Sequence, residues 1–244
     1  MSRIIDCELS DLFKDLEEER RFLVPPDNNA RRALRRRLGE ETVQPYQNVY
    51  ARKSYWEILS VEERHQHLLR TLALIHPEWV FCSYSAACLL GLEVPWKHLN
   101  KVHVLSELRP SGRTPVRLQR HQIRQPIVAH KDDIATTSPL QTIGTCLLES
   151  TFRGGMPLAD SALAKLPFSR EQIAEQIEID GAQRIKIRLE TALQTAAHAD
   201  KRSESGGESI ARATMIVIGF APDYLQYELA DPLNGEHIYR SDYG

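Results

Sequence analysis

The stretch DNNARRALRRRLGEETVQPYQNVYARK, residues 27–53, decides the architecture expected for the N-terminal part of the chain. Asp27 or Asn28 can cap a helix over about 29–38, and Gly39 can end it. At about 100° per residue, Arg31, Arg32, Arg35 and Arg36 fall on one face of this helix, opposite Ala30, Ala33, Leu34 and Leu38. Two short strands, 42–44 and 48–51, then surround Pro45. A basic helix followed by such a hairpin is typical of winged-helix DNA-binding modules.

Positive charge is concentrated in this region, although the whole chain has a formal net charge of -2. Nine basic and three acidic residues lie between Arg20 and Lys53, which leaves a local net charge of +6. A phosphate backbone responds to local charge. We therefore expect double-stranded DNA to contact Arg31, Arg32, Arg35, Arg36, Arg37, Arg52 and Lys53. The alternative is a solvated helix face that pairs with the acidic run Glu17-Glu18-Glu19.

Residues 60–200 predict a mixed domain of several helices and a few strands. Ser60-Val61-Glu62-Glu63 is a capping box that opens a helix to about Ile75, and the apolar stripe of this helix is Leu68, Leu69, Leu72 and Ile75. Further helices are expected over 83–90, 139–148, 157–166, 170–177 and 182–197, and strands over 101–105, 116–121 and 127–130. The polar, glycine-bearing segment 201–207 is expected to be a linker.

The C-terminal residues predict a helix that opens at Glu208, then two strands over 224–229 and 237–243. The second strand carries Asp242. Two such carboxylates can contribute to a Mg²⁺ site that activates water for phosphodiester cleavage. The alternative is that Glu208 complements the helix dipole and that Asp242 is an ordinary terminal residue. Two carboxylates alone do not complete such a site, so we expect no cleavage, and Mg²⁺ as a cofactor only if the protein is a nuclease.

Several classes of protein are excluded by what the sequence lacks. The four cysteines, Cys7, Cys82, Cys88 and Cys146, have no C-x-x-C spacing and are expected to be reduced, buried thiols of a cytoplasmic protein. No signal peptide and no apolar run of membrane-spanning length is present, so we expect no membrane partner. The histidines lack zinc-site spacing, and no P-loop, dinucleotide-binding or nucleophile-elbow motif occurs.

Short motifs follow one another in a characteristic order: RRLG (36–39) with NVYA (48–51), EERH (62–65), SYSAACLLGL (83–92), VHV (102–104), TSPLQTI (137–143), SESGGES (203–209) and SDY (241–243). This order resembles an actinobacterial family, the AbiEi-type antitoxins of type IV toxin–antitoxin systems, in the form fused to a very-short-patch-repair-like endonuclease domain. Where that family usually has Gly, His, Arg and Asp, this chain has Asn48, Tyr84, Gln141 and Gly144.

The resemblance implies an α+β fold in three parts. These are a helical, winged-helix-like module over 1–59, a mixed α/β middle domain over 60–200, and a fragment of a restriction-endonuclease-like fold over 201–244. The family's nuclease continues to a strand with a further acidic residue, so we expect the last part to be truncated.

The function implied is that of a cytoplasmic DNA-binding transcriptional regulator, an antitoxin with double-stranded DNA and a cognate toxin as candidate partners. One alternative is a Mg²⁺-dependent endonuclease, degenerate or truncated, with Glu208 and Asp242 as its catalytic and metal-binding candidates. Another is a non-enzymatic module that binds only a protein partner. Nothing in the sequence fixes the oligomeric state.

Overall fold

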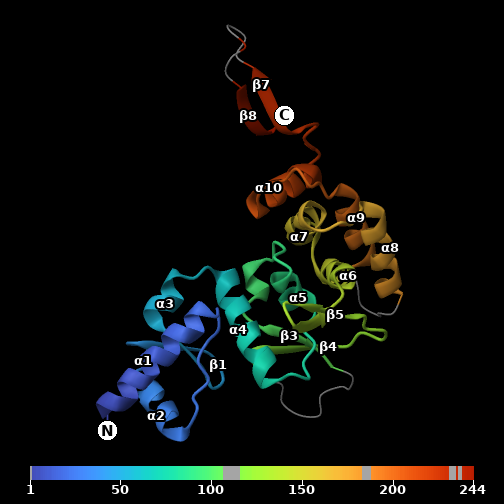
Figure 1. Cartoon of the computed structure of the whole chain (residues 1–244). Coiled ribbons are helices and arrows are strands. Elements are labelled where there is room, and N and C mark those ends of the chain that lie inside the picture. The colour runs from blue at the N-terminus through green and yellow to red at the C-terminus, as the bar shows by residue number, and fades with distance from the viewer. Residues whose placement is uncertain (1, 107–115, 183–187, 231–234, 236–237) are drawn as a thin grey trace.

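The computed structural model describes residues 2–106, 116–182, 188–230, 235 and 238–244, and shows a mixed α and β protein (Figure 1). An N-terminal module lies beside a central body, and a hairpin stands out from the last helix at the far end of the chain. The expected α+β class is therefore confirmed. Among the described residues, no helix combines the length and the apolar character needed to cross a bilayer.

The N-terminal module consists of α1 (Ser2–Glu18), α2 (Asn28–Arg36), β1 (Thr42–Tyr46), β2 (Val49–Arg52) and α3 (Lys53–Ile58). The side chain of Asp27 caps α2 by accepting a hydrogen bond from the Ala30 amide at 2.8 Å. β1 and β2 pair antiparallel across a two-residue turn, in which Asn48 has a φ of 60°. Asparagine tolerates this left-handed conformation better than other residues with a side chain, so it can replace the glycine usual in the resembled family.

A small core holds α2 against the hairpin. It is formed by Leu9, Phe13, Leu23, Ala30, Leu34 and Tyr50. Leu23 and Tyr50 also exchange both backbone hydrogen bonds, each at 2.8 Å, so the segment before α2 pairs with β2.

The central body contains α4 (Val61–Ile75), α5 (Ser83–Leu89), the 3₁₀ turn η1 (Trp96–His98), β3 (Val102–Leu105), β4 (Leu118–His121), β5 (Val128–Lys131), β6 (Ile134–Thr137), α6 (Pro139–Glu149), α7 (Phe152–Lys165), α8 (Arg170–Gly181) and α9 (Leu189–His198). β3 and β4 are parallel, and β5 and β6 are antiparallel. Phe81 joins the two pairs, because it bridges Val104 on one side and Thr136 on the other.

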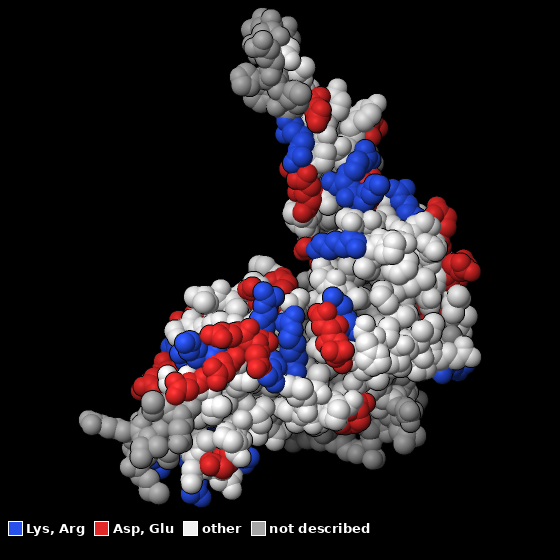
Figure 2. All heavy atoms as spheres, viewed as in Figure 1, with Lys and Arg blue, Asp and Glu red and all other residues white. Residues whose placement is uncertain are grey.

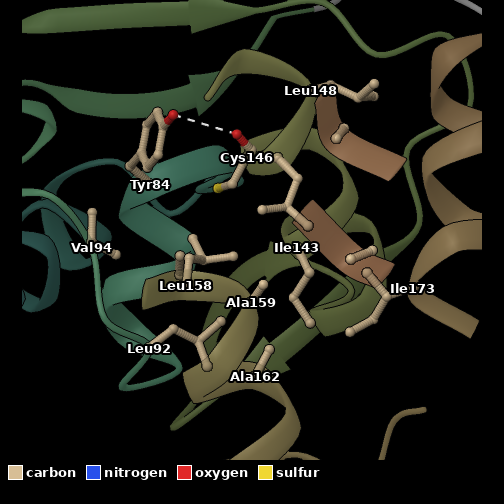
Figure 3. Packing of buried hydrophobic residues seen from close by; sticks show 14 of the residues in the cluster. Tyr84, Leu92, Val94, Ile143, Cys146, Leu148, Leu158, Ala159, Ala162 and Ile173 are labelled. Carbon is tan, nitrogen blue, oxygen red and sulfur yellow. Dashed lines mark hydrogen bonds between the residues drawn. The ribbon is translucent and has the colours of Figure 1, made fainter. Parts of the chain in front are cut away.

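Two hydrophobic cores meet in the body. One fills the space between α5 and the helices α6 to α9, and Figure 3 shows Ile143, Leu158 and Ile173 packed within it. The other lies between α4 and the strands, and it includes Phe22, Val49 and Ala51 of the N-terminal module. Consecutive residues of β2 therefore face different cores, since Tyr50 packs toward α2 and its neighbours pack toward α4. The two parts of the chain on either side of residue 60 share buried contacts.

The C-terminal part consists of α10 (Gly206–Val217), β7 (Leu225–Ala230) and β8 (Ile238–Tyr243), the last two paired antiparallel. α10 packs on α7, whereas the hairpin extends away from the body (Figure 1). The turn expected at 232–235 lies mainly outside the described residues.

Most expected elements are present, but several boundaries differ. The helix expected from Pro157 begins at Phe152, because Thr151 caps an earlier start by accepting a hydrogen bond from the Gly154 amide at 3.1 Å. The expected helix 182–197 begins at Leu189 in the described residues, and α8 extends to Gly181. α3 and β6 were not expected, and the supposed linker 201–207 already contains the first residues of α10.

The cysteine prediction holds where it can be followed. Cys82, Cys88 and Cys146 are buried and are not joined in disulfides among the described residues, and burial raises the pKa of the Cys88 thiol to about 12. The side chain of Cys7 lies outside the described part of the structure.

Two departures from the resembled family meet between α6 and α8. Gln141 Nε2 donates to Asp180 Oδ1 at 3.3 Å. A Cβ atom at Gly144 would lie 2.8 Å from Asp180 Oδ2, so only glycine leaves room for this carboxylate. The residues at 141 and 144 are thus linked through one buried acid on the neighbouring helix.

A buried ion pair attaches α10 to the body. Arg212 Nη2 donates to both carboxylate oxygens of Asp160, at 2.6 and 2.7 Å, and Nη1 donates to the His198 carbonyl at 2.6 Å. Only 5% of Arg212 and 1% of Asp160 is exposed.

We predict that Arg212→Ala lowers the free energy of unfolding by about 3–5 kcal/mol, because it leaves the Asp160 charge buried without a partner. The matched control is Arg240→Ala, which breaks an exposed pair with Glu204 and should cost less than about 1 kcal/mol. Urea denaturation followed by circular dichroism measures both. Equal costs for the two variants would contradict the anchoring role of Arg212.

Candidate functional site

The four arginines on one face of α2 are the candidate nucleic-acid contacts. Arg31, Arg32, Arg35 and Arg36 are all exposed, while Ala30 and Leu34 on the opposite face are buried. The helical phase predicted from the sequence is therefore confirmed for these positions. Leu38 is 38% exposed rather than buried, because α2 ends at Arg36 and Leu38 lies beyond the helix.

These four guanidinium groups form no ion pair with any side chain that the structure describes. The acidic run near the end of α1 has other partners: Arg52 forms a two-pronged pair with Glu17, including a 2.7 Å bond from Nε to Oε1, and Arg21 pairs with Glu19. Neither Glu17 nor Glu19 neutralises α2. Its exposed face consequently carries four guanidinium groups without an ion-pair partner among the described side chains.

The other three predicted DNA contacts are held within the protein. Arg37 lies 3.2 Å from Glu41, Arg52 is bound to Glu17, and Lys53 Nζ donates to the Gly39 carbonyl at 2.9 Å. The hydrogen bonds that Arg52 donates to Glu17 raise the pKa of Arg52. Acidic and basic side chains are interspersed on the face of the N-terminal module that Figure 2 turns toward the viewer. The candidate DNA contact is therefore α2 itself.

Glu208, the first candidate nuclease residue, acts as a structural cap in α10. Its carboxylate accepts hydrogen bonds from the Glu204 amide at 2.9 Å, from Ser205 Oγ at 2.9 Å and from Gln226 Nε2 at 3.1 Å. The Tyr243 hydroxyl donates to the Glu208 carbonyl at 2.6 Å. Glu208 thus connects the start of α10 to both strands of the hairpin.

Asp242, the second candidate, is exposed on β8. Among the residues that the structure describes, no three histidine, cysteine or carboxylate side chains are grouped so that they could hold a metal ion. The arrangement of Glu208 supports a capping role more directly than a metal-binding one.

The structure also brings together a set of residues that the sequence did not single out. A pocket of about 420 Å³, which we call the histidine pocket, opens beside β3 and β4. It is lined by Tyr84, Lys97, His98, Asn100, Lys101, His103, Gln119, His121 and Glu149. These residues come from α5, η1, β3, β4 and the end of α6, so no local sequence pattern indicates the pocket. The one hint in the sequence is the VHV motif, in which His103 stands between two apolar strand residues.

His103 links this pocket to a buried network. Its Nε2 atom lies 3.1 Å from the His98 carbonyl, and its Nδ1 atom lies 2.8 Å from His121 Nε2. Its backbone amide donates to Ser85 Oγ at 2.9 Å, and Ser85 Oγ lies 3.0 Å from His65 Nε2. Burial lowers the pKa of His65 to about 3 and that of His103 to about 4, so both rings are neutral at pH 7.

Comparisons of the chain with protein-family models, with curated proteins and with solved structures found no match. The functional argument therefore depends on the geometry of the residues described above, and the resemblance to the AbiEi-type antitoxins remains an expectation.

We predict that Glu208→Ala lowers the free energy of unfolding of the C-terminal part by about 1–2 kcal/mol, because three donors lose their acceptor. Hydrogen exchange of the first amides of α10 measures the loss, and Glu228→Ala, at an exposed position on β7, is the control. If Glu208 bound a metal, Mg²⁺ would slow the hydrogen exchange of these amides in the wild type but not in Glu208→Ala.

We also predict acid sensitivity from the buried histidines. Their pKa values are lower in the folded than in the unfolded state, so their contribution to stability is complete above pH ~6.5 and is lost as the pH falls toward the folded values. At pH ~5 the loss should be on the order of 2 kcal/mol for each ring.

The test compares urea unfolding at neutral and mildly acidic pH. His65→Gln should flatten this pH dependence, whereas His130→Gln, at an exposed position, should leave it unchanged. An unaltered pH dependence in His65→Gln would show that His65 is not held neutral by burial.

Proposed function

We propose that this protein binds double-stranded DNA through the exposed arginine face of α2 and acts as a transcriptional regulator of the antitoxin type. The observation that carries the proposal is the set of four exposed guanidinium groups on α2 with no ion-pair partner among the described side chains. Guanidinium groups bind phosphate oxygens and guanine edges in a two-pronged manner. Four guanidinium groups on one short helix, without an ion-pair partner among the described side chains, are therefore available to bind DNA.

The geometry of α2 is compatible with a groove of DNA. A helix with its side chains is about 10–12 Å wide, and the major groove of B-DNA is about 12 Å wide. The nine residues of α2 are held from behind by buried Ala30 and Leu34 and are flanked by the β1–β2 hairpin. The arginines can thus approach the DNA on a fixed support.

The net charge of the chain adds a condition to this proposal. With a formal charge of -2, the protein gains no long-range attraction to DNA from its total charge. Binding must depend on the local phosphate contacts of α2, and it should weaken steeply as salt is added.

The regulatory part of the proposal comes from the order of the motifs that resembles the AbiEi-type antitoxins. Under it, the protein acts in the cytoplasm, and a cognate toxin is a further candidate partner. The endonuclease alternative requires Glu208 to ligate a metal, although its carboxylate already accepts three hydrogen bonds. This geometry favours binding over cleavage.

We predict that replacing Arg31, Arg32, Arg35 and Arg36 with alanine flattens the slope of log affinity against log salt by about 3.6, because each phosphate contact contributes about 0.9. Fluorescence anisotropy with a pool of duplex fragments measures this slope. The control replaces Arg124, Lys131, Arg153 and Arg170, four exposed cations of the central body, and removes the same total charge.

Equal slopes for the two quadruple variants would contradict the assignment of α2 as the DNA contact. A second experiment incubates the protein with plasmid and Mg²⁺ or Mn²⁺. Metal-dependent nicking that disappears in Glu208→Ala would replace the binding proposal with the endonuclease alternative.

A further inference from the structure

The histidine pocket plays no part in the proposed DNA contact, and its lining differs from that of an ordinary surface hollow. Its volume of about 420 Å³ lies within the range of about 300–1,000 Å³ that is usual for small-molecule sites. Polar and charged side chains from five elements converge on it. We therefore asked which ligand its charge and hydrogen-bonding groups would select.

Two lysines supply the positive charges. Lys97 and Lys101 are exposed at the pocket, and neither forms an ion pair with a side chain in the described part of the chain. Lysine ammonium groups act as compact point charges and are common phosphate ligands.

His121 supplies a ring whose hydrogen bond to His103 has a defined direction. The neutral ring of His103 donates from Nε2 to the His98 carbonyl, so its Nδ1 atom can only accept, and His121 must donate to it from Nε2. His121 Nδ1 lies 3.3 Å from Glu149 Oε1. The His121 ring therefore lies between His103 and Glu149, within hydrogen-bonding reach of both.

Glu149 is the one acid in this lining, and both of its carboxylate oxygens have a partner. One oxygen faces His121, and the other accepts a hydrogen bond from Ser83 Oγ at 3.3 Å. Two lysines against one carboxylate leave the lining with a formal net charge of +1, counting the histidines as neutral. A phosphate monoester carries a charge of about -1.5 to -2 at neutral pH, and its oxygens can accept from several donors at once.

One wall of the pocket is rigid before any ligand binds. The rings of Tyr84 and His98 stack with their centroids 3.8 Å apart and an angle of 7° between the planes. The Tyr84 hydroxyl is bonded to the Cys146 carbonyl at 3.4 Å, a contact drawn in Figure 3, and lies 3.1 Å from Ser150 Oγ. A preformed wall reduces the entropy lost on binding.

We propose that the histidine pocket is a binding site for a small molecule that carries a phosphate group, with Lys97 and Lys101 as the groups that compensate its charge and His121 as a hydrogen-bonding group beside them. Asn100 and Gln119, which also line the pocket, supply neutral hydrogen-bonding groups for the rest of the molecule. The site is separate from α2, so this proposal can be tested independently of DNA binding.

The test titrates the full chain with inorganic phosphate while the imidazole ¹⁵N and ¹H resonances are recorded, with chloride at matched ionic strength as the reference. We expect saturable shifts of the His98 and His121 ring signals. The double variant Lys97→Gln with Lys101→Gln should raise Kd at least tenfold, because both charged donors are lost. Both side chains are exposed, so this variant should fold normally.

Two further arms locate the binding. The alanine variant of Arg31, Arg32, Arg35 and Arg36 should bind phosphate with unchanged affinity, and a short duplex DNA should leave the His121 signals in place. The proposal is overturned if the shifts do not saturate, if chloride reproduces them, or if the double lysine variant keeps the wild-type Kd. It is also overturned if phosphate binding is lost in the α2 variant, since the anion would then bind the DNA-contact helix.

Discussion

The pairing of Leu23 with Tyr50 is the constraint on which the N-terminal module depends. Their two backbone hydrogen bonds, each 2.8 Å long, fix the segment before α2 against β2. Tyr50 then packs in the same small core as Ala30 and Leu34, which sets the rotation of α2 about its own axis. A slip of one residue in this pairing would turn Tyr50 away from α2. The exposure of the arginine face is therefore a consequence of strand register and not of the arginines themselves.

The same strand connects the module to the body. Val49 and Ala51, on either side of Tyr50, join the core that contains Leu69 and Leu72 of α4. Because side chains alternate along a strand, β2 can serve both cores at once. The helix that we assign to DNA is thus supported by the central body and not by a flexible arm. At the other end of the chain, the buried pair of Arg212 and Asp160 attaches α10 in a comparable way, while the hairpin beyond it makes few contacts with the body.

The sequence predicted those features that depend on neighbouring residues. The phase of α2, its cap at Asp27 and the capping box at Ser60 are local patterns, and the structure contains all of them. The predicted start of α7 was wrong, because Pro157 was taken as the first helical residue, whereas the helix is capped upstream by Thr151. The histidine pocket could not be predicted, because its residues meet only after β3 and β4 pair in parallel across a long connection. The ion pair between Arg52 and Glu17 could likewise not be predicted, because it joins α1 to the end of β2.

The most direct test of the central claim is the response of individual arginine side chains to DNA. The guanidinium Nε–H resonances should be assigned and followed while duplex DNA is added at low salt. The account predicts the largest changes at Arg31, Arg32, Arg35 and Arg36, and little change at Arg52, whose Nε already donates to Glu17. Changes concentrated on the β7–β8 hairpin, or an α2 that does not respond to DNA, would contradict it.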